Sequence, residues 1–117
     1  DEPTSGLDAF QADLVVAKLK GLAESRGGVV ACTLHQPRSA SIERADDVML
    51  LSPGGRVAYC GPRAECAAYF AGLGHECPAQ HSIAEFLVDL VSVDNTSGAA
   101  RRESLARIRL LADAWAR

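Results

Sequence analysis

The chain has 117 residues, 48% of them apolar, a composition that fits a folded protein with a hydrophobic core. Twelve Lys and Arg residues against fifteen Asp and Glu residues give a formal net charge of −3, which excludes a strongly cationic surface for nucleic acid or anionic lipid. No apolar run approaches the roughly 18 residues of a membrane span, so we expect any membrane link to lie outside this stretch.

The first third of the chain predicts a helix followed by a strand. Residues 10–25, FQADLVVAKLKGLAES, carry apolar side chains at helical intervals and predict a helix that stops at Gly27-Gly28. GVVACTL, at 28–34, is continuously apolar and predicts a strand buried on both faces of a parallel sheet. This order indicates a βαβ unit, whose first strand would precede Asp1.

The rest of the chain predicts a hairpin and further helices. VMLL and RVAYC flank Pro53-Gly54-Gly55, so they predict an antiparallel hairpin and make the expected sheet mixed. Ser82 and Glu85 form a capping-box pattern at a helix start. We expect helices at 41–45, 63–74, 82–92 and 102–117, with a loop at 74–81 and a polar linker at 93–101.

The acidic pair Asp1-Glu2 is the first candidate for chemistry. At the end of a buried strand it would lie at the carboxyl edge of a parallel sheet, where α/β proteins bind ligands. In nucleotide hydrolysis one such acid holds Mg²⁺, usually through water, and the next deprotonates the attacking water. Taken alone, the dipeptide more often marks a solvated acidic segment, so the assignment depends on other motifs.

Those motifs produce a family resemblance. DEPTSGLD, followed by a helix, an apolar run and TLHQPRS, resembles the second half of the nucleotide-binding domain of ATP-binding cassette (ABC) transporters. HQPRS, VMLLSPGGRVAYCGP and AEFLVDLVSVD look like the G subfamily, the half-size transporters of the White and pleiotropic-drug-resistance type, with plant and algal members most similar. The resemblance implies an α/β fold that is part of a P-loop NTPase domain, covering residues 1–92.

The resemblance also implies catalytic roles. Asp1 would end the Walker B motif on the magnesium side, Glu2 would be the general base, and His35 would be the switch histidine that senses the γ-phosphate. His35 follows an apolar run, so it would emerge at the same sheet edge as Glu2 and could donate a hydrogen bond to a phosphate oxygen. A lone histidine at such a place is more often structural, and only Glu2 upstream favours the catalytic interpretation.

Ser5-Gly6-Leu7-Asp8 resembles the D-loop, in which Ser5, Gly6 and Asp8 would contact nucleotide across a dimer interface. Asp8 also precedes the first helix, where a carboxylate caps free N–H groups. One departure from the G-type pattern is Ser82-Ile83-Ala84-Glu85-Phe86, where Asn-Pro-Ala-Asp/Glu-Phe is usual. Serine keeps the helix cap, so we expect the helix to form.

Two other sets of residues have simpler explanations. Cys66, His75, Cys77 and His81 match no common zinc spacing, and the four cysteines lack C-x-x-C spacing and predict reduced thiols. Arg107 and Arg109 lie opposite the apolar stripe of the last helix. They predict a solvated face or, as the alternative, an interfacial helix leading toward a membrane domain.

The resemblance implies a fragment of an ATP-hydrolysing subunit that uses ATP and Mg²⁺ to drive export. It would sit at the cytosolic face of a membrane, beside a second ABC subunit, with a transmembrane domain C-terminal to it in the same chain. No G-x-x-x-x-G-K-[ST] loop occurs in the sequence, so we expect the fragment alone to be inactive and, with its sheet uncovered, poorly stable. The alternatives are a soluble ABC-type ATPase of DNA maintenance or translation and a truncated, non-catalytic interaction module.

Overall fold

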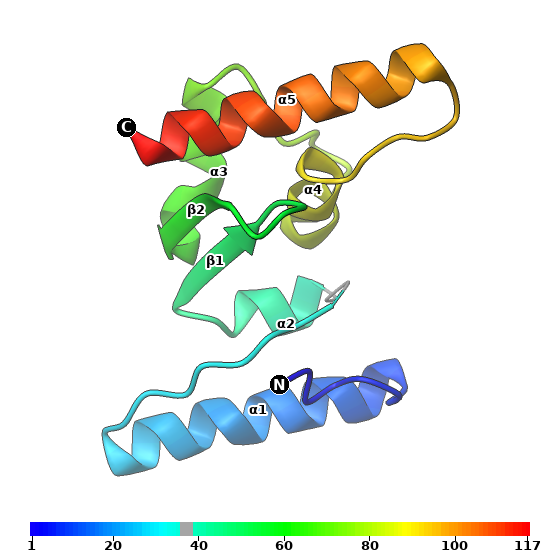
Figure 1. Cartoon of the computed structure of the whole chain (residues 1–117). Helices are drawn as coiled ribbons and strands as arrows, with labels where there is room; N and C mark the ends of the chain where they lie inside the picture. Colours follow the sequence, from blue (N-terminus) through cyan, green and yellow to red (C-terminus); the bar gives the residue numbers. More distant parts are fainter. Residues whose placement is uncertain (36–38) are drawn as a thin grey trace.

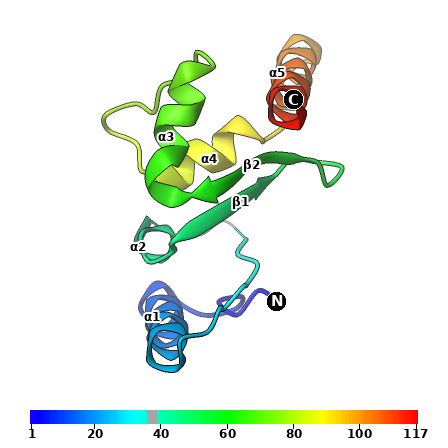
Figure 2. The same ribbon diagram turned by 90° about the vertical axis from the view of Figure 1, so that its left-hand side faces the viewer.

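The architecture is centred on a β-hairpin with helices stacked on either side of it. The computed structural model describes residues 1–35 and 39–117. In both views α1 lies at one end, α2 lies between α1 and the hairpin, and α5 lies at the opposite end (Figures 1 and 2). In chain order the elements are α1 (Ala9–Arg26), α2 (Ser39–Glu43), β1 (Asp47–Leu51), β2 (Val57–Pro62), α3 (Arg63–Gly72), α4 (Ile83–Leu90) and α5 (Gly98–Ala116).

The predicted hairpin is confirmed. Strands β1 and β2 pair antiparallel, with Asp47 opposite Pro62 and an irregularity between Leu50 and Leu51. Both glycines of the turn have positive φ, 91° at Gly54 and 80° at Gly55, a region in which a side chain would be strained. The Pro-Gly-Gly sequence therefore forms a turn that other residues would adopt only at a cost.

A single hydrophobic cluster joins β2 to the three C-terminal helices. Phe70 of α3 is fully buried at its centre, and rings from four elements pack around Tyr59 and Phe70. The ring pairs are Tyr59 with Tyr69, Phe70 and Trp115, Tyr69 with Phe70 and Trp115, and Phe70 with Phe86, at centroid distances of 5.1–6.4 Å. Aromatic pairs at these separations attract beyond simple area burial, so they add to the stability that burial of this cluster provides.

Helix α5 begins earlier than the sequence predicts. Its N-cap is Ser97, whose hydroxyl accepts a hydrogen bond from the Ala100 N–H at 3.0 Å. The predicted linker at 93–101 therefore ends four residues sooner, because serine followed by Gly-Ala-Ala is itself a helix start with good helix formers behind it.

Arg107 does not belong to a solvated face. Its guanidinium donates to the carbonyl oxygens of Leu90 at 3.1 Å, Asp89 at 3.2 Å and Ser92 at 3.1 Å. Asp89 and Leu90 end α4 and Ser92 lies just beyond it, so Arg107 of α5 binds the C-terminal end of that helix. Arg109 is exposed, as predicted.

The strand predicted at 28–34 is absent. Residues 28–34 have no regular structure, and Val29 is 95% exposed. A strand needs a neighbour to pair with its backbone N–H and C=O groups, and no described residue pairs with this run. Among residues 1–35 and 39–117 the sheet is therefore two-stranded and antiparallel rather than mixed.

Helix α1 is confirmed, including its end at Gly27, but its apolar side is open. Val16 is its one buried residue among those described. Large apolar side chains on or just before α1 stand exposed, at Leu7, Phe10, Leu14 and Leu22. Exposed large apolar side chains gathered on one helix often mark a contact with another segment or protein.

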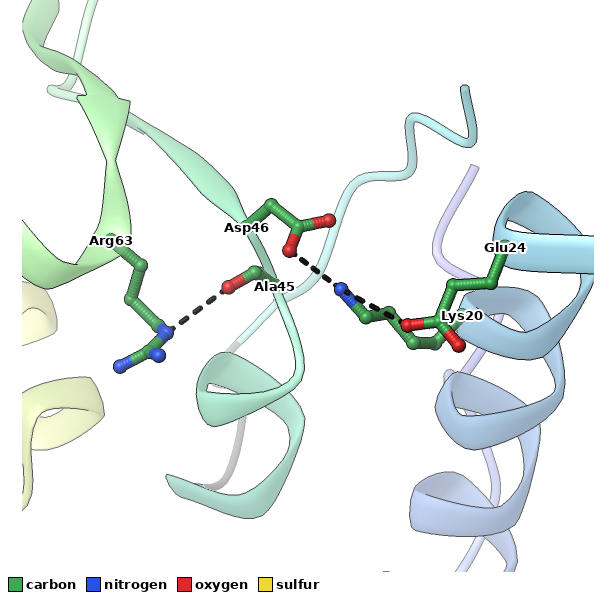
Figure 3. A network of polar contacts seen from close by, with 5 residues as sticks. All are labelled: Lys20, Glu24, Ala45, Asp46 and Arg63. Carbon is green, nitrogen blue, oxygen red and sulfur yellow. Dashed lines mark hydrogen bonds and ion pairs between the residues drawn. The ribbon is translucent and has the colours of Figure 1, made fainter. Parts of the chain in front are cut away.

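Ion pairs attach α1 to the rest of the molecule. Lys20 Nζ of α1 lies 2.6 Å from Asp46 Oδ1, just before β1 (Figure 3). The same Nζ lies 3.9 Å from Glu24 Oε1, which belongs to α1 itself. Arg63, at the start of α3, donates to the Ala45 carbonyl at 3.0 Å in the same network. A further pair joins Arg44 Nε to Asp13 Oδ1 at 2.9 Å. Exposed ion pairs contribute about 0–1 kcal/mol each. The contacts that hold α1 to the rest of the molecule are therefore weaker than those within the hydrophobic cluster.

The four cysteines should differ in reactivity. Cys66 is fully buried, and burial raises the pKa of its thiol to about 11. Because the thiolate is the reactive form, we expect Cys66 at pH 8 to be alkylated more slowly than exposed Cys32 and Cys60, on the order of a hundredfold. Timed iodoacetamide labelling read by mass spectrometry measures this, and equal rates at all three sites would contradict the burial of Cys66.

Candidate functional site

The structure brings the acidic pair into contact with the end of the apolar run. The Glu2 N–H donates to Thr33 Oγ1 at 2.8 Å. The Thr33 hydroxyl in turn donates a hydrogen bond to the Asp1 carboxylate. Asp1 and Glu2 are thereby joined to a residue that lies 32 and 31 positions away from them in the sequence and two positions before His35.

Glu2 has an unusual backbone conformation. Its φ is 45°, the one positive φ at a non-glycine residue among those that the structure describes. This left-handed region is uncommon for a residue with a side chain and costs on the order of 1–3 kcal/mol. The hydrogen bond from its N–H to Thr33 helps to hold Glu2 in that conformation.

A tight turn follows the acidic pair. The Ser5 N–H donates to the Glu2 carbonyl at 3.1 Å, and the Leu7 N–H donates to the Thr4 carbonyl at 3.2 Å. Gly6 has φ 77°, so this position favours glycine. Ser5 and Gly6 are both exposed, which leaves the turn accessible to a ligand or partner.

Asp8 caps α1, as predicted. Its Oδ1 accepts a hydrogen bond from the Gln11 N–H at 2.8 Å, and the Asp8 backbone is extended (φ −69°, ψ 171°). The carboxylate also meets the positive end of the helix dipole. This cap fixes where the turn at residues 3–6 ends and α1 begins.

His35 is exposed at the end of the segment that carries Thr33. The Gln36-Pro37-Arg38 part of the TLHQPRS motif lies outside the described residues. Sequence reasoning did not select Thr33. The available signal was that Thr33 is the one hydroxyl side chain in the apolar run GVVACTL, two positions from His35.

The acidic pair suits a cation that is held partly by water. Asp1 and Glu2 are exposed, and carboxylate oxygens are the ligands that Mg²⁺ prefers. Within residues 1–35 and 39–117, no three His, Cys, Asp or Glu side chains form a cluster able to hold a metal. A Mg²⁺ ion held here would have one carboxylate as its protein ligand, with water in its other positions.

Comparison with known proteins identifies the class of this chain. The family described as ABC-2 type transporter matches residues 35–112, and the chain belongs to this family. ABC transporter G family member 7 of Arabidopsis thaliana is 45% identical over 98% of this chain and 16% of its own length. An uncharacterized ABC transporter ATP-binding protein/permease of Saccharomyces cerevisiae is 39% identical over 98% of this chain and 9% of its own length. ATP-binding cassette sub-family G member 5 of Homo sapiens is 36% identical over 98% of this chain and 17% of its own length.

These relatives support the G subfamily, and membership of the family associates the chain with membrane transport. The chain spans between 9% and 17% of the length of these relatives. None of the helices in the described part of the chain has both the length and the apolar character of a membrane span.

Proposed function

We propose that the chain is the C-terminal part of the ATP-hydrolysing domain of an ABC G-type transporter, a P-loop NTPase fold, and that its parent protein couples ATP hydrolysis to export. The carrying observation is the contact of Asp1 and Glu2 with Thr33, close in sequence to His35. It joins Asp1 and Glu2 to a residue that lies two positions before His35, the third residue to which this proposal gives a role in hydrolysis. The match to ABC transporters supports the transporter class, whereas the family model over residues 35–112 is that of an ABC-2 membrane domain; the assignment to the ATP-hydrolysing domain therefore rests on the motifs at residues 1–8 and 33–35.

In this proposal the two acids have different tasks. Asp1 binds the Mg²⁺ side of the nucleotide through water, and Mg²⁺ neutralises charge on the phosphates. Glu2 orients the attacking water and accepts its proton. His35 donates a hydrogen bond to a γ-phosphate oxygen, which stabilises the charge of the transition state.

The open surfaces of the chain fit a larger domain. The run at 28–34 has the apolar composition of a buried strand, and α1 exposes Phe10, Leu14 and Leu22. A parallel strand paired with residues 28–34 would satisfy their backbone groups, and the sheet so formed would cover the open face of α1. We expect such strands, and the phosphate-binding loop, to come from parts of the parent protein that this chain does not include.

The proposal also assigns partners. The turn at Ser5 and Gly6 is exposed and follows directly on Glu2, a position from which it can meet nucleotide held by a second ABC subunit. A dimer of such subunits would act at the cytosolic face of a membrane, with a transmembrane domain in the same chain. G-family relatives over nearly the whole chain support the transporter class on which this arrangement depends.

Replacement of His35 tests the proposed function. The test requires the full-length protein, by which we mean the parent transporter, comparable in length to the relatives, that contains these residues. His35→Ala removes a hydrogen-bond donor to the γ-phosphate, so we expect ATP turnover to fall by about 10²–10³. The matched control is His81→Ala, an exposed histidine in the loop before α4, which should keep the parent rate.

Purified full-length protein would be assayed for phosphate release at saturating Mg-ATP. A parent protein without ATP turnover, or a His35→Ala variant with the parent rate, would overturn the proposed function. Equal losses of ATP turnover in His35→Ala and His81→Ala would also overturn it, because the loss would then not be specific to His35.

A further inference from the structure

We propose that Thr33 is a positioning residue for ATP hydrolysis: its hydroxyl holds Asp1 and Glu2 together in the geometry that hydrolysis requires. This inference rests on the proposed function and assigns a role within the same site. It concerns a side chain that touches the two acids and does not itself meet the reacting atoms.

The hydroxyl of Thr33 uses both of its hydrogen-bonding capacities. As an acceptor it takes the Glu2 N–H at 2.8 Å, and as a donor it binds the Asp1 carboxylate. One oxygen atom therefore fixes the backbone of one acid and the side chain of the other. A hydroxyl is the smallest group that can accept and donate at once, and neither valine nor alanine can replace it.

The conformation of Glu2 makes this contact consequential. With φ 45°, Glu2 sits in a backbone region that a non-glycine residue leaves readily when nothing holds it. Leaving that region would rotate the Glu2 side chain relative to Asp1. Since the general base must lie within hydrogen-bond reach of its water, a displacement of about 1 Å can cost on the order of a hundredfold in rate.

Both contacts of Thr33 are made by its hydroxyl, and Thr33 belongs to no hydrophobic cluster of the described residues. Thr33→Val keeps the shape of the side chain but lacks the hydroxyl, whereas Thr33→Ser keeps the hydroxyl and lacks the methyl group. Cys32→Ser is the matched control, because it exchanges a single atom at the adjacent residue of the same segment and leaves the hydroxyl of Thr33 in place.

The test measures kcat, KM for Mg-ATP and retained nucleotide in the full-length protein. We expect Thr33→Val to lower kcat by about 10–100-fold while KM changes less than about threefold, because the phosphate-binding atoms are untouched. Thr33→Ser and Cys32→Ser should keep kcat within about twofold of the parent. Thr33→Val should also retain unhydrolysed nucleotide, a result that simple loss of folded protein would not give.

Several outcomes would overturn the inference. These are a parent-like kcat in Thr33→Val, equal losses in Thr33→Val and Thr33→Ser, and a rise in KM at unchanged kcat. Glu2→Gln, assayed beside them, separates this inference from the proposed function. If Glu2→Gln is inactive and Thr33→Val is parent-like, only the role of Thr33 is wrong. If Glu2→Gln keeps the parent rate, or if the parent protein itself shows no ATP turnover, both proposals fail.

Discussion

Glu2→Gln in the full-length protein should lower ATP turnover by about 10²–10⁴ while nucleotide still binds. Glutamine keeps the size of the side chain and its hydrogen-bonding capacity but removes the basic carboxylate, so the attacking water is no longer deprotonated. The backbone N–H of residue 2, which donates to Thr33, is unaffected by the exchange. Nucleotide should therefore accumulate unhydrolysed, because hydrolysis is the step that releases it.

Asp1→Asn is the matched comparison for Glu2→Gln. It disturbs the acid that receives the Thr33 hydroxyl and that we assign to the magnesium side. We expect it to weaken retention of Mg-ATP as well as turnover. Filter binding of labelled ATP and phosphate release would be measured for both variants. The assigned roles are wrong if Glu2→Gln hydrolyses at the parent rate or loses ATP as readily as Asp1→Asn.

The elements that the sequence predicts correctly are those specified by local chemistry. The hairpin follows from Pro53-Gly54-Gly55, and the start of α4 follows from Ser82, whose hydroxyl accepts the Glu85 N–H at 3.1 Å. The end of α1 follows from Gly27 in the left-handed conformation (φ 62°). Caps and turns are set by neighbouring residues, so a single sequence is enough to place them.

The strand predicted at 28–34 shows where local chemistry stops being sufficient. Its apolar composition predicts burial, but pairing depends on a second strand that no local pattern supplies. The role of Arg107 was missed for a similar reason. Its partners are carbonyl oxygens at and just after the end of α4, 15 to 18 positions away, and such backbone groups carry no side-chain signal in the sequence.

The candidate site was predictable in its residue types and not in its contacts. Asp1, Glu2, Asp8 and His35 came from motif order, and the cap formed by Asp8 is confirmed. The contact of Thr33 with both acids depends on how residues 1–2 and 33 meet in space. The catalytic roles themselves stay predictions until turnover of the variants is measured.

Phe70→Ala should have the largest effect on stability among single replacements in the hydrophobic cluster. Phe70 is 0% exposed and contacts the rings of Tyr59, Tyr69 and Phe86, so truncation removes buried surface and leaves a cavity. Such replacements cost about 3–5 kcal/mol, a large part of the stability of a small domain. The fluorescence of Trp115, the only tryptophan, reports the loss in urea titrations because its ring packs against Tyr59 and Tyr69.

Phe10→Ala is the matched control, with the same chemical change at a position that is 73% exposed. In the 117-residue chain it should alter the free energy of unfolding by less than about 0.5 kcal/mol. In the full-length protein we expect a larger cost, because the proposed sheet would cover α1 and bury Phe10. A Phe70→Ala variant as stable as the parent chain would contradict the core described above. A Phe10→Ala variant without effect in both settings would show that α1 stays uncovered, against the proposed domain.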